Sequence, residues 1–248
     1  MSGKTVRIGT YNVGNFSGTD VEAGSELAAK LFREVITADN VDIWALQEDV
    51  GFFNEQRELM PYDAVYDDYK NYKRCGFKKY NYKAFLTNMP LGEVEQIYYT
   101  GEMQFGHAWF LHTQMCIEGK DVCMICVHFD WADKFKRAEQ ISQVIAFASK
   151  YEYSMIIGDY NPDDYINKVL QSRNLTVQED LDLFRAAGFK LANADEFGTF
   201  ATIAHPTQVP HPCDNIAVSP NIRIHAVGKI HRDWMNDHAA LWADVEIC

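Results

Sequence analysis

The stretch Tyr153-Ser-Met-Ile-Ile-Gly-Asp-Tyr-Asn-Pro-Asp-Asp164 predicts a buried β-strand with a polar end. Residues 154–157 form a short apolar run that is bounded by Gly158, which is typical of a buried strand. Asp159 and Asn161 follow two positions apart, so the period of a strand predicts that they point the same way. We therefore expect a carboxylate and an amide together at one strand edge. An Asx-rich turn that only stops the strand would have the same sequence.

A strand–helix–strand unit near the N-terminus also places polar groups at strand ends. An alternating strand over residues 5–10 runs into Asn12. Apolar residues then recur at helical spacing over residues 27–36. A second buried strand over residues 41–46 ends in Glu48. This unit delivers an amide and a carboxylate to corresponding strand ends.

A second unit of the same kind occurs later in the chain. A strand over residues 122–127 ends in His128, and an amphipathic helix follows over residues 135–148. The unit closes with the strand that ends in Asp159. If the two units lie side by side, their four polar residues gather at one edge.

The rest of the chain is predicted to supply antiparallel strands. Asp214, Asp237 and His238 stand at the starts of their strands, so antiparallel pairing with the central strands brings them to the same edge. We expect one α/β domain over residues 1–248. Further strands are predicted at 82–87, 94–98, 108–117, 198–203, 214–219, 222–226 and 241–247, and further helices at 164–171 and 177–187.

Composition fits one folded domain. The 248 residues are 47% hydrophobic, which is enough for a large core, and no linker-like or repeated segment divides them. No apolar run approaches the roughly 18 to 20 residues of a membrane helix, and the N-terminus lacks a signal-peptide core. These features predict a cytoplasmic protein.

The cysteines do not predict a disulfide framework. Six cysteines are thinly spread, and Cys123 and Cys126 lie three apart in a strand, where they face opposite sides. We expect buried free thiols. His205, His211 and Cys213 form a possible zinc cluster, but the prolines between them favour a rigid loop that leads to Asp214.

The polar residues at the predicted edge suit metal-assisted phosphoryl chemistry. Glu48 and Asp237 are hard oxygen ligands, which together with Asn12 and water suit Mg²⁺ or Mn²⁺. Histidines beside several carboxylates exceed what metal binding needs. They suit a reaction in which donors stabilise phosphate oxygens while a base deprotonates water.

The order of these motifs resembles the endonuclease/exonuclease/phosphatase superfamily, whose fold is DNase I-like. The resemblance spans residues 6–245. It implies a two-sheet α/β sandwich that is flanked by helices, with the active site at one sheet edge. It rests on Tyr11-Asn12, Leu46-Gln47-Glu48, Val127-His128, Gly158-Asp159-Tyr160-Asn161, Asp214-Asn215-Ile216-Ala217-Val218-Ser219 and Asn236-Asp237-His238, with Arg137 and Gln140 as further matches.

The resemblance also implies roles for the metal ligands and the base. Glu48 would hold Mg²⁺, assisted by Asn12 and, directly or through water, by Asp237. Asp159 would orient or deprotonate the attacking water. Asn161 would place that water and a phosphate oxygen.

The two histidines would act as donors to the phosphate. His238, oriented by Asp214, would donate to a non-bridging oxygen, and His128 would play a similar part on the leaving-group side. Asn236 and Asn215 depart from residues that are common in the superfamily, but neither removes a catalytic group. Since AP endonucleases carry Tyr at the position of His128, the resemblance favours other branches.

A local basic segment predicts a nucleic-acid substrate, most readily DNA. The net charge is −12, yet residues 70–83 contain six basic residues and no acid, interleaved with aromatic residues. Such a segment can contact phosphates and stack on bases. A solvated strand pair whose tyrosines pack on the core is the alternative, and Trp131 could likewise contact substrate or cap the sheet. The predicted substrate-binding residues are Lys73, Arg74, Lys78, Lys79, Tyr80 and Trp131.

Three functions remain open from the sequence. The leading one is a Mg²⁺-dependent nuclease that hydrolyses phosphodiester bonds. The second is a phosphatase or lipid phosphodiesterase of the same superfamily, for which Phe52 and Phe53 are the weak membrane-contact candidates. The third is a catalytically silent binding module, which the intact set of polar residues disfavours.

Overall fold

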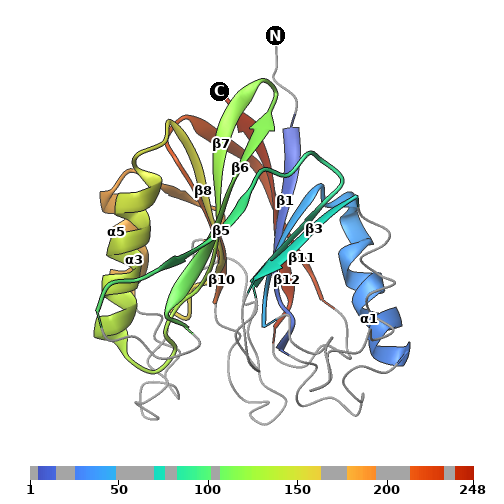
Figure 1. The fold of residues 1–248 in the computed structure, drawn as a ribbon, viewed down its shortest axis with the longest axis horizontal. Coiled ribbons are helices and arrows are strands. Elements are labelled where there is room, and N and C mark those ends of the chain that lie inside the picture. Colours follow the sequence, from blue (N-terminus) through green and yellow to red (C-terminus); the bar gives the residue numbers. More distant parts are fainter. Residues whose placement is uncertain are drawn as a thin grey trace.

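Two β-sheets pack face to face between helices (Figure 1). The computed structural model describes residues 5–14, 26–48, 70–75, 83–101, 107–162, 178–193, 213–231 and 238–248. Helix α1 (Glu26–Ile36), which a short 3-10 turn at Ala38–Asn40 follows, covers the outer face of one sheet. Helices α3 (Lys134–Ala148) and α5 (Gln178–Ala186) cover the other. The predicted α/β sandwich is confirmed.

The first sheet has the strand order β11-β12-β1-β2-β4-β3. Strands β1 and β2 are parallel, and every other neighbouring pair in this order is antiparallel. The strands are β1 (Thr5–Asn12), β2 (Ile43–Gln47), β3 (Asn71–Cys75), β4 (Lys83–Thr87), β11 (Ile222–Ile230) and β12 (Ala240–Ile247).

The second sheet repeats this plan with the order β5-β6-β7-β8-β10-β9. Its central pair, β7 and β8, is parallel, and its other neighbouring pairs are antiparallel. The strands are β5 (Val94–Tyr98), β6 (Trp109–Ile117), β7 (Lys120–His128), β8 (Tyr153–Asp159), β9 (Lys190–Leu191) and β10 (Asp214–Val218).

Strand alternation divides the apolar side chains among three packed layers. Ile8, Phe85 and Ile157 face the space between the sheets. Phe32 of α1 packs against the outer face of the first sheet, and Ile141 of α3 against that of the second. Burial of these side chains on both faces is the main stabilising contribution, at roughly 25 cal/mol per Å² of apolar surface.

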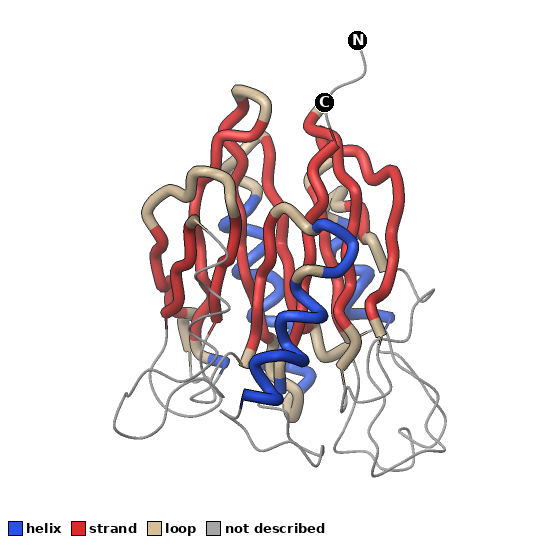
Figure 2. The backbone as a smooth tube through the Cα atoms, turned by 90° about the vertical axis from the view of Figure 1, so that its right-hand side faces the viewer, coloured by secondary structure: helices blue, strands red, loops and turns tan. Residues whose placement is uncertain are grey.

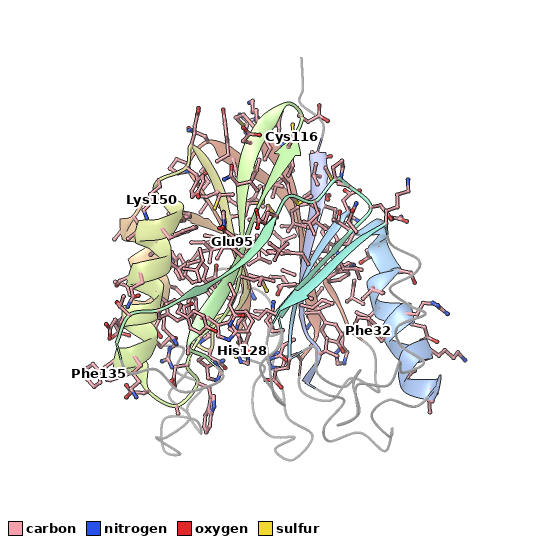
Figure 3. All side chains as sticks on the ribbon, viewed as in Figure 1. Phe32, Glu95, Cys116, His128, Phe135 and Lys150 are labelled. Atoms are coloured by element: carbon pink, nitrogen blue, oxygen red, sulfur yellow. The ribbon has the colours of Figure 1, made fainter. Side chains whose placement is uncertain are left out.

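The two parallel pairs bring their strand ends to the same edge of the sandwich. Asn12 is level with Gln47 in one pair, and His128 is level with Asp159 in the other. Antiparallel β10 begins at Asp214, which is also level with Asp159. The strands of both sheets lie roughly along one axis, with the C-terminus near one end of that axis (Figures 1 and 2). His128 lies toward the opposite end (Figure 3).

Gly158 lets β8 approach β7 immediately before Asp159. Its φ is 153°, and a Cβ on this residue would lie 2.0 Å from the carbonyl oxygen of Val127. Only glycine tolerates so close an approach of two backbones. Gly158 therefore fixes the position of the Asp159 carboxylate that follows it.

Most of the predicted elements in the described ranges are present. The helix predicted at 177–187 is α5, and Gly188 follows it with a φ of 85°. Strands β3 and β9 were not predicted individually, and β11 is longer than expected. The helix predicted at 164–171 and the strand predicted at 198–203 lie outside the described residues. No described helix is long and apolar enough to cross a membrane.

Candidate active site

Asp159 is the centre of the polar cluster at the sheet edge. Its side chain is about 1% exposed. Oδ1 accepts a hydrogen bond from the backbone N–H of Asn161 at 2.9 Å, and Oδ2 accepts one from Nδ2 of Asn12 at 2.9 Å. The Nε2 atoms of His128 and His238 lie 3.5 and 3.6 Å from the same Oδ2. One buried carboxylate thus faces two imidazoles.

A turn, rather than strand alternation, positions Asn161. The strand ends at Asp159, and Asn161 has a left-handed φ of 44°. Its Nδ2 donates to the backbone oxygen of Phe129 at 3.0 Å. The prediction that strand alternation makes Asn161 point the same way as Asp159 is therefore wrong in its reason, because the chain has already left the strand at Asn161. The Asx turn that competed with the functional interpretation is the device that holds Asn161 beside Asp159.

His238 and Asp214 form a buried hydrogen-bonded pair. Nδ1 of His238 lies 2.9 Å from Oδ2 of Asp214, and both side chains are buried. The backbone oxygen of Asp214 accepts from Nδ2 of Asn193 at 3.1 Å. Asn215 in turn makes two hydrogen bonds to the backbone of Asn193. Asn215, which departs from the superfamily pattern, thus links the start of β10 to the backbone of Asn193.

His128 lies at the other side of Asp159. It ends β7 between the two sheets (Figure 3). Its Nε2 is 3.8 Å from Oε1 of Glu48. The ring of His107 meets that of His128 edge-on at 4.5 Å, and Nδ1 of His107 lies 3.1 Å from the backbone oxygen of His128. His107 was not predicted as a site residue, because no motif in the sequence marks it.

Burial shifts the pKa values in this cluster in opposite directions. Desolvation, with a further contribution from the negative charge of Asp214, raises the pKa of Asp159 to about 7. Desolvation, followed by electrostatic interactions with His107 and with the positively charged Lys83, holds the pKa of His128 well below its usual value. At neutral pH, Asp159 is therefore close to its midpoint and His128 is neutral.

The oxygen-rich side of the cluster fits a hard divalent cation. Glu48 follows β2 with a left-handed φ of 52°, and its Oε1 lies 3.3 Å from Nδ2 of Asn12. Carboxylates and an amide are the ligand types that Mg²⁺ prefers. Nδ2 of Asn12 faces Glu48 and Asp159, and its Oδ1 accepts from the N–H of Gly14 with one of its two lone pairs. The predicted ligand Asp237 lies outside the described residues.

A second group of potential ligands overlaps the histidine pair. Ligand atoms of Asp159, Asp214 and His238 lie within 4.8 Å of one another. The 2.9 Å hydrogen bond between His238 and Asp214 already occupies one atom of each. The arrangement therefore suits a metal on the Glu48 side better than one on the hydrogen-bonded pair of His238 and Asp214.

Trp131 is half-exposed on the connection between β7 and α3. Its exposed fraction is 48%, which does not fit a cap on the sheet interior. Arg137 and Gln140 hold this connection, because they bond the backbone oxygen and N–H of Asp130. Gln140 also donates to the backbone oxygen of His107 at 2.6 Å. These two helix residues thus position the segments around His128.

The structure describes part of the basic segment. Lys73 and Arg74 lie in β3, the edge strand of the first sheet, and Lys78, Lys79 and Tyr80 lie outside the described residues. Lys83 is only 1% exposed, so this one of the six basic residues is not part of a solvated surface.

The cysteine prediction is confirmed in part. Cys123, Cys126 and Cys213 are buried and form no disulfide, and Cys123 and Cys126 face different cores. Cys116 and Cys248 also form no disulfide, but they are exposed. His205 and His211, the other members of the possible zinc cluster, lie outside the described residues.

Comparisons with known proteins identify the fold. Neither the protein-family models nor the curated protein sequences contain a match. Among solved structures, the chain resembles an endonuclease/exonuclease/phosphatase family protein from Leptotrichia buccalis, at 17% identity and a TM-score of 0.67, with 97% and 99% of the two chains covered. It also resembles D. rerio TDP2 complexed with a single-strand DNA product, at 14% identity and a TM-score of 0.71, with 98% and 99% covered.

A third solved structure agrees with these two. The endonuclease/exonuclease/phosphatase from Bacteroides vulgatus has 15% identity, a TM-score of 0.70 and coverage of 99% and 100%. The chain therefore has the DNase I-like fold of the endonuclease/exonuclease/phosphatase superfamily, as the order of its motifs indicated.

Proposed function

We propose that this chain is a Mg²⁺-dependent phosphodiesterase that hydrolyses nucleic acid, most readily DNA, by attack of water. The observation that carries the proposal is the position of Asp159 between the Nε2 atoms of His128 and His238, at 3.5 and 3.6 Å. A base flanked by two donors matches a reaction that both deprotonates water and accumulates charge on phosphate oxygens.

Asp159 is the proposed general base. A carboxylate whose pKa is near 7 can accept a proton from water at neutral pH more readily than an ordinary aspartate. The two hydrogen bonds from Asn12 and Asn161 hold it in one orientation. We assign to the Asn161 side chain, which lies beside Asp159, the contact with the water or a phosphate oxygen.

His238 and His128 are the proposed donors. Nδ1 of His238 donates the 2.9 Å bond to the carboxylate of Asp214, and this carboxylate favours the imidazolium form, in which Nε2 also carries a proton and faces the site. Neutral His128 would donate on the leaving-group side from Nε2, in the tautomer that carries its proton there. Glu48 and Asn12, with Asp237, would hold Mg²⁺, which when bound supplies electrostatic stabilisation of the phosphate.

Two observations support nucleic acid as the substrate. The TDP2 neighbour was solved with a single-strand DNA product. In this chain, β3 carries Lys73 and Arg74 at the edge of the sheet that also contributes Asn12. A basic strand beside a phosphodiesterase site can track a polyanion.

A substrate panel tests the proposal. Plasmid DNA, single-stranded DNA, RNA, sphingomyelin, inositol phosphates and bis-p-nitrophenyl phosphate are each incubated with Mg²⁺ and with EDTA. We expect EDTA-sensitive hydrolysis of DNA and of the small diester, and loss of both in Asp159→Asn. Hydrolysis of sphingomyelin or inositol phosphates alone would favour the phosphatase or lipid phosphodiesterase alternative. No turnover of any substrate would favour a silent binding module.

A further inference from the structure

Lys83 is a buried lysine that spans the gap between the two sheets. It begins β4, and strand alternation places it on the same face as Phe85, whose side chain lies in the core between the sheets. Its residue exposure is 1%. Nζ lies 3.9 Å from the ring centroid of Trp109, which belongs to β6 of the opposite sheet. The ammonium group is therefore fixed by a rigid aromatic surface.

The ammonium group lies beside the Glu48–His128 side of the site. Lys83 is level with Gln47, the residue before Glu48, in the pairing of β4 with β2. The negative charge of Glu48 acts to raise the pKa of Lys83. The positive charge of Lys83 lowers the pKa values of His128 and His107. The register with Gln47 and these electrostatic effects thus place the cation within electrostatic range of the predicted metal ligand and the predicted leaving-group donor.

Within the described ranges, no hydrogen-bond acceptor faces the ammonium group of Lys83. Nζ makes no hydrogen bond or ion pair with these residues, and it lies against the face of Trp109. An ammonium group carries three donors, and burying them unmatched is unfavourable. By contrast, Nζ of Lys120, which lies 5.0 Å from the ring of Tyr153, also donates to the backbone oxygen of Ile247.

We propose that Lys83 binds substrate phosphate, with its ammonium group donating to a non-bridging oxygen on the Glu48–His128 side. The identity of this anion as the substrate rests on the proposed function. Burial lowers the pKa of Lys83 to about 8, so the ammonium form still predominates at neutral pH. An anion would supply the missing acceptor, and the cation–π contact with Trp109 would keep the donor in place.

This placement predicts opposite effects on the two charged ligands. A fixed positive charge near Glu48 repels a divalent cation and attracts phosphate. Removing that charge should therefore weaken phosphate binding and strengthen Mg²⁺ binding in the absence of phosphate. A lysine that only stabilises the core would change the unfolding temperature and leave both affinities unchanged.

Lys83→Met, which removes the charge and retains an apolar stem, tests the proposal against Lys120→Met. Binding of inorganic phosphate and of Mg²⁺ is measured by calorimetry, and thermal unfolding checks the fold. We expect Lys83→Met to bind phosphate about 10- to 100-fold more weakly, the range for one charge-assisted contact. Mg²⁺ alone should bind about 3- to 10-fold more tightly. Lys120→Met should match the wild type in both.

Unchanged phosphate affinity in folded Lys83→Met would overturn the role of Lys83, whether or not Mg²⁺ binds more tightly. If Lys83→Met does not fold, NMR of ¹³Cε-labelled lysine in the wild type replaces it. A Lys83 signal that inorganic phosphate does not shift would then refute the proposal. The hydrolase proposal fails separately, if the wild type turns over no substrate. Full activity of folded Lys83→Met on the small diester would refute the role of Lys83 alone.

Discussion

The pairing of His238 with Asp214 predicts that the two residues act as one catalytic unit. His238→Ala removes the donor that faces Asp159, and loss of one preorganised donor costs about 10²- to 10³-fold in kcat. Asp214→Asn leaves the imidazole but removes a buried, charge-assisted bond of 2.9 Å. Such a bond contributes about 1.5 to 3 kcal/mol, which corresponds to about 10- to 100-fold in rate.

The double variant distinguishes a unit from two independent groups. If Asp214 acts only through His238, then His238→Ala and His238→Ala/Asp214→Asn should be about equally slow, because residues that act together are not additive. The assay is single-turnover hydrolysis of a small phosphodiester at saturating Mg²⁺, with a calorimetric Mg²⁺ titration of each variant. Asp214→Asn should bind Mg²⁺ as the wild type does.

A surface pair provides the matched control. Nε2 of His225 lies 2.8 Å from Oε2 of Glu246 on β11 and β12, and 39% of the His225 side chain is exposed. His225→Ala should therefore leave kcat unchanged. Fully multiplicative losses in the double variant would contradict the unit. So would recovery of Asp214→Asn by raised Mg²⁺ alone, which would place Asp214 on the metal.

The remaining predictions concern the metal, the substrate and the base. Glu48→Gln should weaken Mg²⁺ binding in calorimetry without unfolding the protein, whereas exposed Glu95→Gln should not; unchanged affinity in the former would remove Glu48 from the metal. In metal-free protein, NMR should show the Asp159 carboxyl titrating near pH 7, and at higher pH in His238→Ala because a nearby positive charge is lost; a midpoint near 4 would contradict the burial argument. Alanine substitutions at four positions of the basic segment should weaken DNA binding and flatten its salt dependence by about one unit of slope per lost phosphate contact. The four positions are Lys73, Arg74, Lys78 and Lys79. Turnover of a small diester should survive, and equal loss on both substrates would exclude a nucleic-acid groove.

Strand ends were the part of the site that the sequence could predict. Asn12, His128 and Asp159 each end a strand with a clear apolar pattern, so their common edge follows from parallel pairing. Asp214 could be placed because antiparallel β10 starts where β8 ends. In these cases a local pattern and a general rule of sheet geometry were sufficient.

Contacts between distant segments were beyond the sequence. Lys83 was counted with a basic, solvated segment, because composition does not show that β4 turns its first side chain toward Trp109 in the other sheet. His107 and Asn193 belong to no motif. They support the site through hydrogen bonds to the backbone oxygens of His128 and Asp214. Such bonds depend on the packing of whole elements, which no short pattern encodes.

The candidate site is also the seam of the sandwich. Asn12 belongs to one sheet and Asp159 to the other, and a single 2.9 Å hydrogen bond joins them across the interface. Neither sheet alone presents the proposed base together with the proposed metal ligands, so the proposed activity requires both sheets in register. A hydrolysis assay would therefore also report how the two sheets are aligned. A change in packing that lets one sheet slide over the other should abolish the proposed activity while each sheet keeps its own backbone hydrogen bonds.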